Sequence, residues 1–264
     1  MQTQRIVHLS DSHLPANERK KLYGYYPHHT LKKVVQAIAK LEPRPSAVVA
    51  TGDISDDGAS LSYTFFQQYL KPLGVPVFWL PGNHDEPAVM ATSDTEQLSK
   101  QRAITLGDWQ LILLNSQIVH ESRGHIKKEQ LDFLGSSLKQ HPNAPSIIAL
   151  HHTPCSPCVD SNCQLDNHKE LLAFLKNHKQ VKLVLAGHTH QAEKTSLDGF
   201  DVFTAPSTFA QVSHPNNTSA LDPNDFFASH QLDGARVGFS VFDLKPDGSY
   251  AQLLHWLSAK QTAA

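Results

Sequence analysis

Histidines and carboxylates gather at the ends of five short apolar runs in this sequence. In LVLAGHTH, residues 183–190, an apolar run ends in two histidines separated by one residue. Alternate residues of an extended segment point to the same side, so both imidazole rings could bind one small object. A polar loop with no chemical role would look the same. The other four runs decide between these interpretations.

The pattern recurs in IVHLSDSH, AVVATGDIS, VFWLPGNHD and IIALHH. Because ligands of open α/β sheets bind at the carboxyl ends of strands, we expect the five polar endings to meet along one edge. Each ending alone also fits a turn, a helix cap or a core histidine. Five of them, each after an apolar run, favour a site. Its members are Asp11, His13, Asp53, Asn83, His84, His151, His188 and His190.

The donor groups of this set indicate metal binding. Carboxylate, amide and imidazole groups without a thiolate suit Mn, Fe or Zn better than Ca or a structural zinc. Eight groups exceed the needs of one ion, so we expect two divalent metal ions, Mn or Fe in preference and Zn as an alternative. Two such ions, about 3.5–4 Å apart, share a ligand. Asp53, next to Gly52, is the expected bridge because a carboxylate has two oxygens.

These motifs, in this order, resemble the calcineurin-like metallophosphoesterase superfamily. The segments ATGDISDDGASLSY, WLPGNHD, GHTHQ and APST resemble its class III cyclic nucleotide phosphodiesterases, and the similarity covers nearly the whole chain. The resemblance implies an α/β fold, a four-layer α-β-β-α sandwich of two mixed sheets flanked by helices. It also assigns Asp11, His13, Asp53 and His190 to one metal, and Asp53, Asn83, His151 and His188 to the other.

The site and the resemblance together predict a binuclear-metal-dependent phosphodiesterase. We expect it to hydrolyse 3′,5′-cyclic AMP to 5′-AMP by attack of a metal-bridging hydroxide. His84 is expected to stabilise the transition state or protonate the leaving alkoxide, while Asp85 either orients the His84 ring or caps the following helix. Asn83, His84 and His214 are the expected substrate contacts.

Two other functions stay open at this point. One is the same chemistry on another phosphate ester, such as a nucleotide pyrophosphate, a glycerophosphodiester or a monoester. The other is a non-catalytic scaffold on the same fold, although the filled ligand positions and the presence of His84 argue against it.

Charge and cysteine content limit the partners and the compartment. The 264 residues carry a formal net charge of −2, which gives no basic field for nucleic acid or an anionic membrane. No apolar stretch is long enough to span a bilayer. Cys155, Cys158 and Cys163 lie in one loop and are expected to be free thiols of a cytoplasmic protein, with a third metal site as the alternative. A small-molecule nucleotide is the expected partner, and a homodimer is allowed.

The elements that must position the site alternate between short apolar runs and amphipathic segments, which predicts one α/β domain over residues 1–264. Strands are expected at 5–9, 46–50, 76–80, 110–115, 146–150, 181–186, 200–205, 236–243 and 249–257. Helices are expected at about 29–41, 60–70, 127–140 and 167–178. The long loops 154–166 and 206–233 are expected to act as lids.

Overall fold

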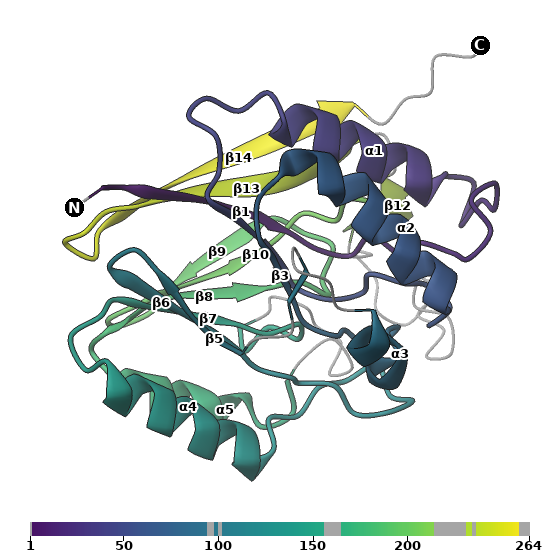
Figure 1. The fold of residues 1–264 in the computed structure, drawn as a ribbon. Helices are drawn as coiled ribbons and strands as arrows, with labels where there is room; N and C mark the ends of the chain where they lie inside the picture. Colours follow the sequence, from purple (N-terminus) through teal and green to yellow (C-terminus); the bar gives the residue numbers. More distant parts are fainter. Residues whose placement is uncertain are drawn as a thin grey trace.

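The computed structural model describes residues 2–93, 98–99, 102–155, 165–213, 231–233 and 236–258. Two six-stranded mixed sheets pack face to face, with helices on both outer faces (Figure 1). Helices α1 (Pro27–Ile38) and α2 (Ser60–Leu70) cover one sheet, and α4 (Lys128–Gln140) and α5 (His168–Lys176) cover the other. The four-layer α-β-β-α sandwich expected from the sequence is confirmed.

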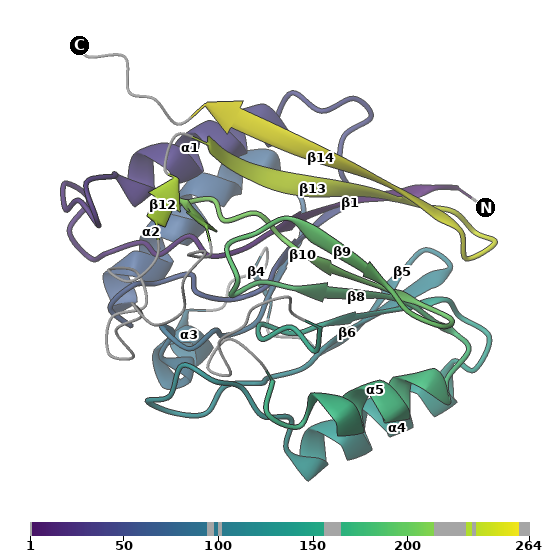
Figure 2. The same cartoon turned by 180° about the vertical axis from the view of Figure 1, so that it is seen from behind.

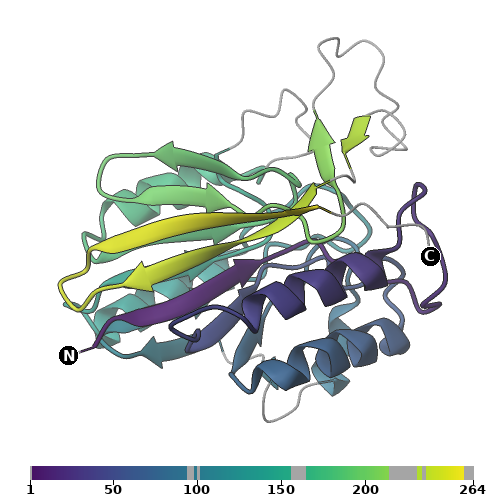
Figure 3. The same cartoon turned by 90° about the horizontal axis from the view of Figure 1, so that it is seen from above.

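The first sheet combines four parallel strands from the N-terminal half with a C-terminal hairpin. Its order is β14 (Tyr250–Ser258), β13 (Arg236–Leu244), β1 (Gln4–Leu9), β2 (Ala47–Ala50), β3 (Val77–Trp79) and β4 (Leu98–Ser99). Strands β1 to β4 run parallel, whereas β13 pairs antiparallel with both β1 and β14. From above, the yellow hairpin β13–β14 lies beside the purple β1 (Figure 3).

The second sheet has a parallel centre and an antiparallel strand at each edge. Its order is β5 (Ala103–Leu106), β6 (Trp109–Leu113), β7 (Ser146–Ala149), β8 (Val181–Ala186), β10 (Asp201–Thr204) and β9 (Glu193–Ser196). Figure 2 shows this sheet from behind, with α4 and α5 on its outer side. A small separate sheet pairs β11 (Gln211–Ser213) with β12 (Gln231–Asp233).

Side chains alternate along the central strands and so fill three apolar layers, one between the two sheets and one between each sheet and its helices. In β2, Ala47 and Val49 lie in the core between the sheets, whereas Val48 and Ala50 pack toward the helices. Strands covered on both faces read as continuous apolar runs, which explains the AVVA sequence. Helix α1 contributes Leu31 and Val34, three residues apart on its buried face. The strands are therefore held rigidly up to the points where their polar endings begin.

Every strand and helix expected from the sequence is present, with ends shifted by at most about three residues. The structure adds elements that the sequence pattern did not indicate: β4, β5, β9, β11, β12, a 3₁₀ helix at Lys71–Leu73 and α3 (Pro87–Thr92). Among the described residues, every helix is too short or too polar to cross a membrane.

Candidate metal centre

The polar endings meet at one edge of the two packed sheets. Asp11 and His13 follow β1, Asp53 follows β2, Asn83 and His84 follow β3, His151 follows β7, and His188 and His190 follow β8. Backbone hydrogen bonds join neighbouring endings: the Asp11 N–H donates to the Gly52 carbonyl across 3.0 Å, and the Gly187 N–H to the His151 carbonyl across 2.9 Å. The site is thus built across both sheets.

Five of these residues have a left-handed backbone conformation. The φ angle is +54° at Asp11, +43° at His13, +48° at Asp53, +71° at His188 and +52° at His190. A positive φ is uncommon for residues other than glycine and costs on the order of 1–3 kcal/mol each. The surrounding packing must supply this free energy. The left-handed residues turn the chain after β1, β2 and β8.

Glycines allow the polar endings to approach one another closely. A Cβ atom on Gly52 would lie 2.6 Å from both the Gly82 nitrogen and the His151 Nδ1. A Cβ on Gly82 would collide with the Asp53 carboxylate, and one on Gly187 with the Ser10 hydroxyl. Glycine at these positions is therefore required by space.

Asp11, His13 and His190 form a first cluster of donor atoms, all buried. The Nε2 atoms of His13 and His190 are 3.0 Å apart, and the His190 Nε2 is 3.5 Å from the Asp11 Oδ1. The Nδ1–H of His190 donates to the Ala210 carbonyl across 2.8 Å. This bond fixes the tautomer, so that the lone pair of His190 Nε2 faces the cluster.

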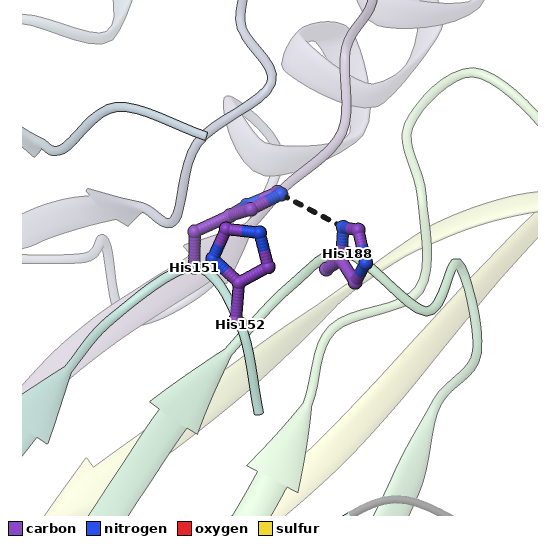
Figure 4. Close-up of side chains that lie close together, drawn as sticks. All are labelled: His151, His152 and His188. Atoms are coloured by element: carbon purple, nitrogen blue, oxygen red, sulfur yellow. Dashed lines mark hydrogen bonds between the residues drawn. The ribbon is translucent and has the colours of Figure 1, made fainter. Parts of the chain in front are cut away.

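A second cluster is centred on the Nε2 atom of His151. It lies 3.1 Å from the Asn83 Oδ1, 3.2 Å from the His188 Nδ1 and 3.3 Å from the Asp53 Oδ2. Figure 4 shows the rings of His151 and His188 directed toward each other. The His151 Nδ1–H donates to the Thr51 carbonyl across 2.7 Å, so the neutral ring presents the lone pair of its Nε2 to the cluster.

Asp53 lies between the two clusters. Its Oδ2 is 3.3 Å from the His151 Nε2 and 3.6 Å from the His13 Nε2, which belong to different clusters. Its Oδ1 accepts the backbone N–H of His84 across 2.9 Å. One carboxylate oxygen is therefore fixed by the fold, and the other faces both groups of donors.

The donor atoms fit divalent cations. Atoms bound to one ion at about 2.0–2.2 Å lie roughly 3–3.6 Å from one another, the spacing found in both clusters. Lone pairs and carboxylate oxygens that face each other repel unless a proton or a metal cation lies between them, and both clusters have the spacing for either. Carboxylate, amide and imidazole donors without thiolate match Mn, Fe or Zn.

The pKa values of the buried groups reflect how closely carboxylates and imidazoles are packed here. Burial raises the pKa of Asp53, but the nearby His151 and His84 outweigh it and hold that pKa well below its usual value. Burial lowers the pKa of His188 to about 3, whereas at His151 burial is outweighed by the charges of Asp53 and Asp11, which raise the pKa of that ring to about 9. A metal ion bound at His151 would have to displace its proton. An ionised carboxylate and a neutral imidazole are the forms in which these side chains bind metals.

His84 lies beside the first cluster and is partly accessible, with its side chain 32% exposed. Its ring meets the His13 ring edge-on, with centroids 4.7 Å apart. The His84 Nδ1 lies 3.4 Å from the Asp56 carbonyl oxygen and 4.0 Å from the Asp56 Oδ1. Burial lowers the pKa of His84, while Asp53 and Asp56 act in the opposite direction.

Asp56 is a site residue that sequence reasoning missed. Its Oδ1 lies 3.6 Å from the Nδ1 of His13, so the same carboxylate is close to both His13 and His84. Nothing in the letters DD distinguishes it from its neighbour Asp57, whose Oδ1 accepts the Ala59 N–H and the Ser62 hydroxyl at the start of α2. Only the folded turn separates their roles.

Asp85 has neither of the two roles expected from the sequence, which were to orient the His84 ring or to cap the following helix. Its buried carboxylate accepts the backbone N–H groups of Ile54, Ser55 and Gly82. It does not cap α3, because the N-cap of that helix is Glu86, which makes no side-chain cap bond. The carboxylate beside the His84 ring belongs to Asp56 instead. Asp85 ties the turn after β2 to the turn after β3.

His152 lies beside His151 and His188, with which it could form a metal-binding group, but both of its ring nitrogens already have hydrogen-bond partners (Figure 4). The Ser116 hydroxyl accepts the His152 backbone N–H across 3.2 Å and donates to its Nδ1 across 2.9 Å. The Nε2–H then donates to the Ser122 carbonyl across 3.1 Å. Both ring nitrogens are engaged, so His152 supports the neighbouring ring of His188, 4.6 Å away between centroids.

Three residues singled out in the sequence lie outside the described residues: Cys158, Cys163 and His214. Cys155 is described as a free, half-buried thiol packed against the core beneath α4 and α5. Burial raises the pKa of this thiol, which keeps it protonated at neutral pH.

A family model described as calcineurin-like phosphoesterase matches residues 4–192. The chain belongs to the calcineurin-like phosphoesterase family. The resemblance noted in the sequence is thereby confirmed, and the family implies divalent metal ions, for which both clusters supply candidate ligands.

Curated calcineurin-like relatives carry a more specific activity. A 3′,5′-cyclic-nucleotide phosphodiesterase of Nostoc sp. is 36% identical, covering 93% of this chain and 89% of the relative. The 3′,5′-cyclic adenosine monophosphate phosphodiesterase CpdA of Pseudomonas aeruginosa is 33% identical, covering 82% and 80%. CpdA of Escherichia coli is 29% identical, covering 96% and 90%.

Solved structures confirm the calcineurin-like fold. A dimetal phosphatase from Danio rerio matches with a TM-score of 0.66 at 16% identity, covering 99% of this chain and 98% of that chain. The Plasmodium inner-membrane-complex anchor GAP50 matches with a TM-score of 0.63 at 15% identity, covering 100% and 87%. At these identities the likeness concerns the fold alone.

Proposed function

We propose that this protein hydrolyses 3′,5′-cyclic AMP to 5′-AMP at a centre that holds two divalent metal ions. The observation that carries the reaction class is the position of the Asp53 Oδ2 between two groups of converging donor atoms. The relatives named cyclic nucleotide phosphodiesterases support the nucleotide as substrate.

The proposed ligands divide between the two ions with Asp53 in common. Asp11, His13, Asp53 and His190 would hold one ion, and Asp53, Asn83, His151 and His188 would hold the other. When bound, such a pair of ions activates water and neutralises charge on the phosphoryl oxygens. The chain contributes the fixed tautomers of His151 and His190, so that no ring must turn to bind.

His84 is the proposed proton donor. The Asp56 carbonyl lies at hydrogen-bond distance from its Nδ1. With Nδ1–H held there, a proton on Nε2 is the one available for transfer. As the oxygen of a hydroxide, formed from water that has lost a proton to solvent, bonds to phosphorus, the bond from phosphorus to O3′ breaks. O3′ takes the Nε2 proton, and His84 regains a proton from solvent. The leaving alkoxide is strongly basic, which makes the transfer valuable.

A substrate panel tests the proposal. Purified protein loaded with Mn is assayed on cyclic AMP, bis-p-nitrophenyl phosphate, p-nitrophenyl phosphate and nucleotide pyrophosphates, with products separated by chromatography. We expect 5′-AMP from cyclic AMP. Formation of 3′-AMP, or ready cleavage of pyrophosphates or monoesters without turnover of cyclic AMP, would contradict the assignment.

Other parts of the sequence-based reading stay predictions. They are the choice of Mn or Fe over Zn, the cytoplasmic compartment, the homodimer, the absence of nucleic-acid and membrane partners, the single domain over 1–264, and the lids at 154–166 and 206–233 with His214 as a substrate contact.

A further inference from the structure

A cavity of about 250 Å³ lies where α3 packs near the ends of β3 and β6. Apolar side chains such as Trp79, Pro87, Met90 and Leu113 form most of its wall. None of the lining residues belongs to the metal clusters. Its volume is below the range of about 300–1,000 Å³ for drug-sized ligands, so an occupant must be small.

One cation, Arg102, projects into this wall. Its Nη2 donates to the Gln130 Oε1 across 2.6 Å, and its guanidinium carbon lies 4.0 Å from the centre of the Phe133 ring. Burial lowers the pKa of Arg102. Within the described part of the chain it makes no ion pair with a carboxylate. A guanidinium has five N–H donors, and among the described residues only Gln130 accepts from this one.

Two carboxamides in the same wall also present donors. The Gln130 Oε1 accepts both the Arg102 guanidinium and the Asn115 backbone N–H, the latter across 3.1 Å. The Asn115 Oδ1 accepts the backbone N–H of Gln117 across 2.9 Å. Because both amide oxygens are engaged, the NH₂ groups are what these side chains can offer. Among the described lining residues, the polar side chains therefore offer one positive charge and amide N–H donors.

We propose that this cavity binds a small ring compound that carries one carboxylate. The ring packs against Trp79, Pro87 and Met90, and the carboxylate pairs with Arg102. A carboxylate accepts hydrogen bonds only and matches the planar guanidinium with two parallel bonds. Pro81 also lines the cavity and precedes Asn83 by two residues, so the ligand would contact the segment that leads into the metal centre. The proposal does not depend on the identity of the substrate.

Fluorine NMR on the full-length protein tests the site with two probes of equal shape. 4-Fluorobenzoate is titrated against the protein, and the neutral 4-fluorobenzamide serves as its control. We expect saturable binding of the benzoate and at least about tenfold weaker binding of the amide, the usual loss when a charge-assisted hydrogen bond is removed. Equal affinity of the two probes, or no saturable benzoate binding, overturns the proposal.

Three variants assign the binding to this cavity. Arg102→Met should weaken benzoate binding at least about tenfold. Ala91→Phe, at an exposed lining position, should block the cavity while Arg102 stays in place. Arg236→Met is the matched control, because Arg236 stacks on Trp256 away from this wall. Should Arg102→Met fail to fold, Ala91→Phe decides. Unchanged benzoate affinity in a folded Arg102→Met or Ala91→Phe protein refutes the site.

Discussion

The backbone N–H of His84 donates to the Oδ1 of Asp53 across 2.9 Å. This bond joins the turn after β3 to the turn after β2 and commits one oxygen of the carboxylate. The other oxygen, Oδ2, is left facing His13 and His151. One oxygen of Asp53 thus has a structural role and the other the proposed ligand role, and a substitution can remove one while it keeps the other.

Asp53→Asn should keep the bond to the His84 N–H and lose the shared ligand, because an amide can retain the accepting oxygen but replaces Oδ2 with NH₂. We expect activity to be abolished and the metal content to fall from about two ions per chain to less than one. Metal analysis after gel filtration, together with the rate on cyclic AMP, measures both. A variant that retains two ions would show that Asp53 is not the bridge.

His84→Ala should keep both metals and lose about 10²–10⁴ in turnover, the usual contribution of a positioned acid. The loss should be larger for an alkyl diester than for bis-p-nitrophenyl phosphate, whose leaving group needs no proton. His29→Ala, at an exposed position on α1, is the control and should leave the rate unchanged. Parent-level hydrolysis of the poor-leaving-group diester by His84→Ala would exclude the donor role.

Asp56→Asn and Asp57→Asn form a matched pair of adjacent changes. Asp56 lies beside His84 and His13, so we expect turnover to fall about tenfold with the fold intact. Asp57 bonds the start of α2, so its variant should lose about 1 kcal/mol of unfolding free energy and keep its turnover. Rates and urea unfolding curves separate the two. A loss of turnover in Asp57→Asn and a loss of stability alone in Asp56→Asn would show that the two carboxylates have been given the wrong roles.

Asp243→Asn should lower the free energy of unfolding at neutral pH but not in acid. Two bonds of 2.6 and 2.7 Å join Arg5 to Asp243 across β1 and β13, and this hydrogen bonding lowers the pKa of Asp243. A carboxyl group whose pKa is lower in the folded than in the unfolded protein stabilises the fold. This contribution is fully present above the unfolded pKa of about 3.9 and is lost as the pH falls through the pKa of the folded state. Both side chains are partly exposed, so we expect about 0.5–1 kcal/mol at pH 7.

Urea unfolding at pH 7 and near pH 2.5 measures this difference. Asp198→Asn, at an exposed loop position, is the control and should change neither value. An equal loss for Asp243→Asn at both pH values would show that packing, rather than charge, explains the effect.

Much of the candidate metal centre was predictable because each proposed ligand comes shortly after a buried strand. Asp11 comes two residues after β1, and His188 comes two residues after β8. Carboxyl ends of parallel strands share one edge, so sequence order alone brought such residues together. Asp56 and Asp85 show where this reasoning ends. Their partners lie in turns whose paths depend on left-handed residues, and no periodicity in the sequence encodes those paths.

The elements that sequence patterns missed are short or lie at sheet edges. Helix α3 has six residues, too few to display helical periodicity. In β9, Lys194 and Ser196 are exposed, so the strand lacks the apolar run that marked the central strands. Such edge strands are held by pairing with a neighbour, here β10, rather than by their own composition.

The left-handed backbone at Asp11, His13, Asp53, His188 and His190 makes this centre inseparable from its turns. A positive φ redirects the bond from Cα to Cβ, and every rotamer of the side chain starts from that direction. The same five side chains grafted onto regular strands or helices of another scaffold would point elsewhere, whichever rotamers were chosen. In this protein the main chain sets the directions of the candidate ligands, and a transplant would have to carry the loops together with the side chains.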